Sequence, residues 1–166
     1  MRKRLQLFTA VLALACAHWA QALEPGQAAP DIELPQGSVA QRLSELRGRL
    51  VYLDFWASWC GPCRQSFPWM NDMQRKYGAR GLQVVAVNLD AKRADADQFL
   101  ARHPASFGLA FDARGESARL VGVKAMPTSL LLAPDGRVLW VHAGFRVEDR
   151  DSLEARIAAA LAARGP

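Results

Sequence analysis

Cysteine and histidine are scarce in this sequence, with three of each among 166 residues. A small secreted scaffold held by disulfides needs more cysteines, and a structural zinc site needs four ligands. The chain has one C-x-x-C pair, Cys60 and Cys63, and no second pair. We therefore interpret this pair as reactive, in preference to a purely structural disulfide or part of a zinc site.

A strong charge excess is also lacking once the N-terminus is set aside. The formal net charge is +5, but residues 1–22 contain three basic and no acidic residues. The rest of the chain has 18 basic and 16 acidic residues, a net charge of +2. Because basic residues are not clustered among aromatic ones, we expect no nucleic-acid partner. The share of apolar residues, 51%, is that of an ordinary globular protein.

The N-terminus has the pattern of an export signal. Residues 2–4 (RKR) are basic, residues 7–17 are apolar except for one threonine, and residues 20–22 read AQA. This order of segments is typical of a secretory signal peptide, here cut after Ala22. We therefore expect a signal peptide over residues 1–22, a single domain over residues 23–166, and a periplasmic protein.

Two other interpretations of this segment stay open. The first is an uncleaved membrane anchor, although polar residues dilute the apolar run and make it a poor membrane span. The second is lipidation at Cys16, which ends a loose match to a bacterial lipoprotein box (LALAC).

The remaining chain alternates apolar runs with helical patterns. Residues 50–56 and 82–89 are almost continuously apolar, as in strands that are covered on both faces. Shorter strands are expected near 109–111, at 128–133 and at 138–142, and helices at 62–77, 95–102 and 116–121. The last two strands flank a PDG turn at 134–136, which predicts a hairpin. In the alanine-rich C-terminus, Leu153, Ile157 and Leu161 recur at four-residue spacing and predict a final helix. This order predicts an α/β fold with a central mixed β-sheet flanked by helices on both faces.

The cysteine pair falls where the first long strand gives way to a helix. Cys60 is then at the helix N-terminus, where free N–H groups and the helix dipole favour a thiolate. Pro62 is tolerated in the first helical turn because its missing N–H costs nothing there. Thiol–disulfide exchange needs this arrangement: an exposed attacking thiolate with a second thiol close behind it.

Residues 53–63 (LDFWASWCGPC) resemble the active-site segment of thioredoxins. The chain is more closely similar to the exported TlpA/ResA-like thiol–disulfide oxidoreductases. It shares their APD lead-in at residues 29–31, VVAVN at 84–88, MPT at 126–128 and PDGR at 134–137. The resemblance implies a thioredoxin fold with an inserted helix–strand element in residues 91–121.

The resemblance also implies site residues. Cys60 is the nucleophile and Cys63 the resolving thiol, and their redox-active disulfide takes the place of a cofactor or metal. Pro127 corresponds to a cis-proline beside the cysteines. The positions assigned to substrate binding are Trp59, Gly61, Pro62, Met126 and Pro127.

Asp54 is the third candidate catalytic residue. It matches the buried acid of thioredoxins, whereas many ResA-like relatives have Asn there and a Glu at the position of Ser66. An isolated carboxylate in a buried strand is costly, which favours a functional role. We expect Asp54 to have a raised pKa and to accept the proton of Cys63.

The expected function is the reduction of protein disulfides outside the cytoplasm. The resemblance suggests substrates in cytochrome c or copper-site maturation and a membrane electron donor of the DsbD/CcdA type. Two alternatives stay open: a peroxiredoxin-like peroxidase, and a Cu(I)-binding module that uses the two thiols. His103, expected to be exposed, and His142 have no spacing that connects them with the cysteines.

Overall fold

The structure is a computed structural model that describes residues 23–163. The predicted signal peptide, residues 1–22, lies outside the described residues. Within the described range the sheet has five strands in the order β3-β2-β1-β4-β5. Their bounds are β1 Leu50–Trp56, β2 Leu82–Asn88, β3 Gly108–Phe111, β4 Thr128–Leu132 and β5 Val138–Ala143.

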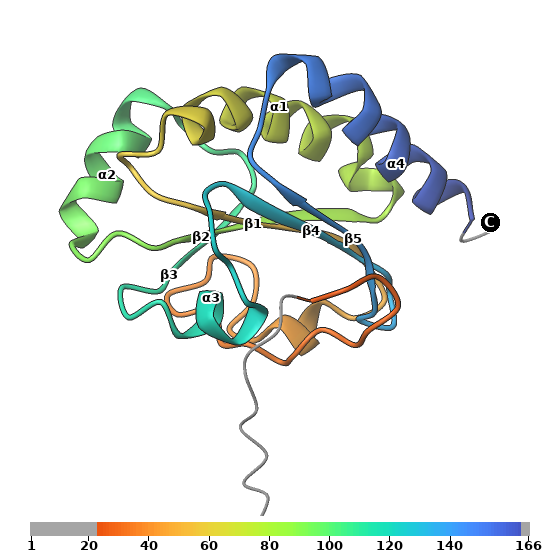
Figure 1. The fold of residues 1–166 in the computed structure, drawn as a ribbon. Coiled ribbons are helices and arrows are strands. Elements are labelled where there is room, and N and C mark those ends of the chain that lie inside the picture. Colours follow the sequence, from red (N-terminus) through yellow and green to blue (C-terminus); the bar gives the residue numbers. More distant parts are fainter. Residues whose placement is uncertain (1–22, 164–166) are drawn as a thin grey trace, which may run out of the picture.

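Four α-helices and three short 3-10 helices complete the described part. The α-helices are α1 Gly61–Tyr77, α2 Arg93–Arg102, α3 Glu116–Val121 and α4 Arg150–Ala162. The 3-10 helices are η1 Leu43–Leu46, η2 Gly78–Arg80 and η3 Val147–Asp149. In Figure 1, α1, α2 and α4 cover one face of the sheet, and α3 and the N-terminal lead-in cover the other. None of the helices in residues 23–163 is long and apolar enough to span a membrane.

The sheet is mixed, as predicted. β1 pairs with β2, and β2 with β3, in parallel, whereas β1–β4 and β4–β5 are antiparallel. All seven residues of β1 are buried, which agrees with its continuous apolar run. The segment 91–121 contributes α2, β3 and α3, and β3 forms an edge of the sheet beside β2.

The hairpin between β4 and β5 follows from its turn sequence. Ala133 and Arg137 are joined by an N–H to carbonyl hydrogen bond of 2.8 Å. Gly136 has a φ of +83°, a conformation that side chains with a Cβ rarely adopt. The hairpin pairs β5 with β4, and β4 in turn pairs with β1, where it contributes residues behind the cysteines.

The C-terminal helix packs beside α1 (Figure 1). Leu153, Ile157 and Leu161, spaced four residues apart, are all buried in the core cluster that also contains the cysteines. Near the C-terminal end of α1, the hydroxyl of Tyr77 donates to Glu154 Oε1 at 2.7 Å. The face of the sheet that carries the cysteines is therefore closed by two helices that contact each other.

Candidate active site

The two cysteines form a disulfide at the start of α1. Their Cα atoms are 5.3 Å apart. Cys60 is the N-cap of the helix, and the backbone N–H of Cys63 points at its sulfur, with an N–S distance of 3.2 Å. The first turn of α1 contains Pro62 and no acidic residue. A thiolate at Cys60 in the reduced protein therefore meets N–H groups and the positive end of the helix dipole.

The loop that leads to Cys60 is held by a carboxylate on the next strand connection. Asp90 accepts hydrogen bonds from the backbone N–H and the hydroxyl of Ser58, at 2.9 and 3.0 Å. The side-chain amide of Asn88 donates to the same carboxylate at 2.7 Å. Sequence analysis did not single out these residues, because the contact joins segments about thirty residues apart. These hydrogen bonds to Asp90 fix the position of the loop that leads to Cys60.

Exposure around the pair is uneven. In this disulfide form Cys60 is 4% exposed and Cys63 fully buried, so the expected exposure of the attacking sulfur is wrong for the oxidised state. The bond to Cys63 and the contact with its N–H draw the Cys60 sulfur back onto the helix. Trp59, by contrast, is 70% exposed, and Gly61 and Pro62 are also exposed. The pair thus lies directly beneath a surface formed by its own loop.

The peptide bond between Met126 and Pro127 is cis, as the resemblance implied. Met126 is half-buried and packs against the core cluster that includes both cysteines. The carbonyl of Pro127 accepts the N–H of Gly144 at 2.7 Å, and the hydroxyl of Thr128 donates to the carbonyl of Ala125. The loop before β4 is thus tied to the end of β5, on the same side of the sheet as the cysteine pair.

Asp54 lies in the middle of β1 and is completely buried. Side chains alternate along a strand, so Asp54 faces the same side as Tyr52 and Trp56, which share a core cluster with Cys63. Ser129 donates its hydroxyl proton to Asp54 Oδ1 at 2.6 Å. The other oxygen, Oδ2, has no hydrogen-bond partner among residues 23–163. One carboxylate oxygen is thus held and the other is free within the core.

Burial raises the pKa of Asp54 to about 7, against an ordinary value of 3.8, and the hydrogen bond from Ser129 lowers it in part. Near neutral pH the carboxyl is therefore divided between its two protonation states. A general acid–base catalyst works best under this condition, because it both accepts and releases a proton readily.

The other positions that sequence analysis examined serve the core. Trp56 is fully buried, and its ring contacts those of Phe67 and Phe99, with centroids 4.8 Å away in each case. Ser66, which stands where many ResA-like relatives have Glu, donates its hydroxyl to the carbonyl of Cys63 at 3.0 Å. It is 1% exposed and carries no titratable group, so of these two positions only position 54 has a carboxyl.

Both histidines are half-buried, and for His103 this differs from the expected exposure. His103 is half-buried rather than exposed, because its ring lies against Phe99 with centroids 4.7 Å apart. Burial and then the nearby charges of Arg64 and Arg102 lower its pKa. His142 is also half-buried, and its register partner across β4 is Ser129. No group of three or more His, Cys, Asp or Glu side chains that could hold a metal ion occurs in the described part of the chain.

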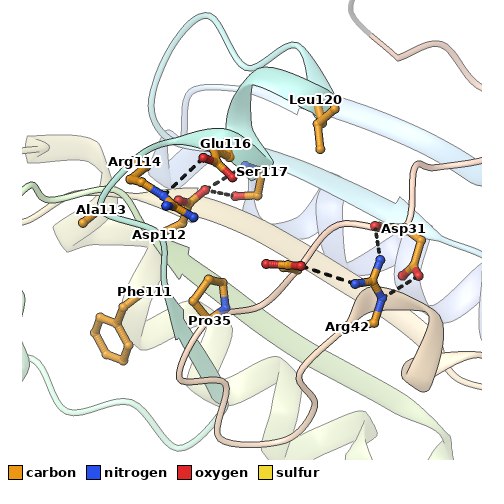
Figure 2. A pocket seen from close by; sticks show the side chains of 11 residues that line it. Asp31, Pro35, Arg42, Phe111, Asp112, Ala113, Arg114, Glu116, Ser117 and Leu120 are labelled. Carbon is orange, nitrogen blue, oxygen red and sulfur yellow. Dashed lines mark hydrogen bonds and ion pairs between the residues drawn. The ribbon is translucent and has the colours of Figure 1, made fainter.

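Figure 2 shows a pocket on the opposite face of the sheet, between the N-terminal lead-in and α3. Its charged side chains pair with one another. Arg42 contacts Asp31 at 2.9 Å and Glu33 at 3.5 Å, and Arg114 contacts Glu116 at 3.2 Å. These ion pairs tie the lead-in to itself and brace the start of α3, away from the cysteines.

A disulfide at a helix N-cap, a cis-proline loop and a buried acid on a five-stranded mixed sheet define a thioredoxin-fold thiol–disulfide oxidoreductase. The sequence profile of the Redoxin family matches residues 24–157, and the chain belongs to this family.

Relatives of known activity agree with this assignment. The chain is 38% identical over 130 residues to the thiol-disulfide oxidoreductase ResA of Oceanobacillus iheyensis, covering 75% of this chain and 68% of that protein. It is 29% identical over 129 residues to ResA of Bacillus subtilis, covering 77% and 72%. The protein is thus ResA-like.

Solved structures give the same fold. A Chlorobium tepidum protein assigned as thiol:disulfide interchange protein DsbE is 60% identical, with a TM-score of 0.81 over 84% of this chain and 99% of that one. The thioredoxin domain of a Bacteroides vulgatus thiol-disulfide oxidoreductase has a TM-score of 0.70 over 81% and 99%. At 18% identity, the second match supports the fold alone.

Proposed function

We propose that this protein reduces disulfides of other proteins outside the cytoplasm, with Cys60 as nucleophile, Cys63 as resolving thiol and Asp54 as proton acceptor. The observation that carries the proposal is the Cys60–Cys63 disulfide at the N-cap of α1, on the face of the sheet that also carries a buried carboxyl with a pKa near 7. A merely structural disulfide needs neither the helix N-terminus nor the acid.

The reaction begins with the reduced protein. The Cys60 thiolate attacks one sulfur of the substrate disulfide, forms a mixed disulfide and releases the other substrate sulfur as a thiolate. Asp54 then takes the proton of Cys63, and the Cys63 thiolate attacks the Cys60 sulfur. The second substrate sulfur leaves as a thiolate and gains a proton. Two electrons pass from the dithiol to the substrate, and the protein is left as the disulfide seen here.

Substrate contacts come from the surface around the pair. Trp59 is the most exposed large apolar side chain of the described residues, and Gly61 and Pro62 lie beside it. On the other side of the sulfurs, the loop of Met126 and Pro127 presents backbone groups next to an extended substrate segment. We propose these five residues as the substrate-binding surface.

Direction and partners follow from the same site. The dipeptide Gly61-Pro62 between the cysteines is that of thioredoxin, whose potential is about −270 mV, against about −120 mV for the oxidant DsbA. A reductant must regain two electrons, and we propose a membrane dithiol donor of the DsbD/CcdA type. We propose substrates in cytochrome c or copper-site maturation, as the resemblance to the TlpA/ResA-like proteins suggests.

The reduction potential of the pair tests the direction. We expect a value near that of thioredoxin, together with reduction of insulin disulfides that is lost in Cys60→Ser. A potential near that of DsbA would reverse the direction. Full activity of Cys60→Ser would contradict the mechanism.

Export is tested at the N-terminus. We propose that residues 1–22 are removed after Ala22 and that the protein acts in the periplasm. Protein purified from the periplasm of a Gram-negative host should begin at Leu23. A chain that keeps residues 1–22, or one acylated at Cys16, would contradict the proposed cleavage and favour an anchored form.

A further inference from the structure

The partner of Asp54 was not among the residues that sequence analysis selected. Ser129, in β4, lies directly opposite Asp54 in the antiparallel register with β1. It is 2% exposed, and its hydroxyl donates to Asp54 Oδ1 at 2.6 Å. This bond is at the short end of the range for a hydroxyl and a carboxylate, as expected when the acceptor is charged.

A second hydroxyl, that of Tyr52, shares this strand face. Tyr52 lies two residues before Asp54 and is 1% exposed. Burial, followed by the charge of Asp54, raises the pKa of Tyr52, so the phenol stays neutral. A serine hydroxyl has one proton, and Ser129 donates it to Asp54.

A purely structural reason for the buried pair is weak, because apolar residues at positions 54 and 129 would cost less free energy to bury. Instead Ser129 holds one carboxylate oxygen, and Oδ2 has no partner among the described residues on the face where Cys63 packs. The hydrogen bond from Ser129 therefore orients the carboxylate but does not fully offset the free energy lost by burying it.

We propose that Ser129 is a positioning residue for the exchange reaction: it holds Asp54 by Oδ1 and leaves Oδ2 for the proton of Cys63. The inference rests on the proposed function, since it assigns a residue to the proton transfer of the same site. Without the hydroxyl, the carboxylate loses its one hydrogen-bond donor among the described residues, and the neutral acid becomes the dominant form at neutral pH.

Other groups that titrate near Asp54 are few. On its own strand face there is Tyr52, on α1 the cysteine pair, and from β2 the facing residue is Ala86, which has no charge. On β5 the register partner of Ser129 is His142. Its Nε2 lies 3.5 Å from Asp149 Oδ2 at the start of α4, and an effect from this ion pair is separable by substitution of His142.

The test compares Ser129→Ala with Ser129→Thr, which keeps a hydroxyl. The mixed disulfide on Cys60 is formed with a substrate peptide, and its resolution by Cys63 is timed between pH 5 and pH 10. A hydrogen bond to a charged group corresponds to about one to two pH units. We expect Ser129→Ala to move the midpoint of the pH–rate profile upward by that amount and to slow resolution at pH 7 by about five- to fiftyfold. At pH values above the new midpoint, the resolution rates of the wild type and of Ser129→Ala should converge.

Three further variants make the result specific. Ser129→Thr should keep the wild-type midpoint, and Ser129→Val, which has the shape of threonine without its hydroxyl, should shift it as Ser129→Ala does. His142→Gln should leave it within a few tenths of a unit. Ser117→Ala is the matched control, because it removes a 2.6 Å hydroxyl–carboxylate bond to Asp112 away from the cysteines and should leave the midpoint of the rate profile unchanged.

A parallel titration of the Asp54 carboxyl by infrared spectroscopy, in the oxidised protein, separates the two levels of the proposal. An unshifted carboxyl titration in Ser129→Ala overturns the inference about Ser129. A shifted titration with an unshifted rate profile overturns the role of Asp54 in exchange. If Ser129→Ala does not fold, Ser129→Val carries the test, and an unchanged midpoint in that variant counts against the proposal.

Discussion

Two buried aspartates, Asp54 and Asp112, differ in how they are solvated. Asp112, 5% exposed, follows β3 and accepts both the backbone N–H and the hydroxyl of Ser117, at 2.7 and 2.6 Å. Burial raises its pKa, but these bonds, with those from the backbone of Glu116 and Arg114, outweigh burial and leave the pKa below its ordinary value. Asp54 has one donor, and its pKa is about 7.

The difference teaches that burial alone does not identify a functional carboxyl. Asp112 is a structural acid that caps the turn before α3, and its charge is fully met by local donors. Asp54 is held by a single hydroxyl and keeps one oxygen unpaired within the described core. A buried carboxyl that has few hydrogen-bond donors and lies near a redox pair is a candidate for proton transfer, because no structural interaction offsets the free energy lost by burying it.

The largest expected difference between Asp54 and Asp112 is their effect on how the free energy of unfolding changes with pH. The folded pKa of Asp54 is about 7 and the ordinary value is 3.8, so the native state binds the extra proton between these values. The free energy of unfolding therefore falls by about 4 kcal/mol as the pH rises from about 4 to about 7, because each unit of pKa shift corresponds to about 1.36 kcal/mol. We expect Asp54→Asn to abolish this fall and to be the more stable protein at pH 8.

Urea denaturation of the oxidised protein at several pH values measures this effect. Asp112→Asn is the control and should keep the fall between pH 4 and pH 7. Parallel pH curves for the wild type and Asp54→Asn would show that Asp54 titrates normally in the fold.

The second prediction concerns catalysis. Asp54→Asn should fold but slow disulfide exchange near pH 7 by about a hundredfold or more, the usual contribution of a general base. The loss should shrink at high pH, where Cys63 ionises without help. Stopped-flow measurement of exchange from pH 5 to pH 10 checks it, and equal kinetics in both proteins across this range would exclude the proposed role.

Asp112→Asn should show the opposite pattern, a loss of stability with no change in exchange. Removing a buried charge-assisted pair costs about 1–3 kcal/mol. Because the pKa of Asp112 is lowered, its contribution is present above the unfolded value and is lost as pH falls through the folded value. Thermal denaturation should give the full difference from wild type at pH 7, and this difference should shrink as the pH falls further below 3.8.

The smallest effect is expected in the pocket of Figure 2. Arg42→Gln breaks the contacts with Asp31 and Glu33, whose side chains are 39% and 69% exposed. Exposed ion pairs contribute about 0–1 kcal/mol. We expect a change of this size in denaturant midpoint and wild-type exchange kinetics. A marked loss of exchange activity would place function on the face that we describe as structural.

The fold was largely predictable because its signals are local. The continuous apolar runs gave β1 and β2, the turn at 134–137 gave the hairpin, and the spacing of Leu153, Ile157 and Leu161 gave α4. Asp54 was also predictable, because a carboxylate in a buried strand violates the apolar pattern around it.

Two other features, the pairing of Ser129 with Asp54 and the burial of Cys60, depend on strand register and on the oxidation state of the cysteines. Ser129 is separated from Asp54 by 75 residues, and only the pairing of β1 with β4 brings them together. A shift of one residue would turn Ser129 to the other face of the sheet. The burial of Cys60 follows from its bond to Cys63, which a pattern of residue types does not specify.

Trapping of the mixed disulfide tests the central claim most directly. Cys63→Ala should hold a substrate protein on Cys60 through a bond that dithiothreitol releases, and mass spectrometry should find the linkage at Cys60. The converse variant, Cys60→Ala, should trap none. A linkage at the remaining cysteine of both variants, or of neither, would contradict the account of an attacking Cys60 and a resolving Cys63.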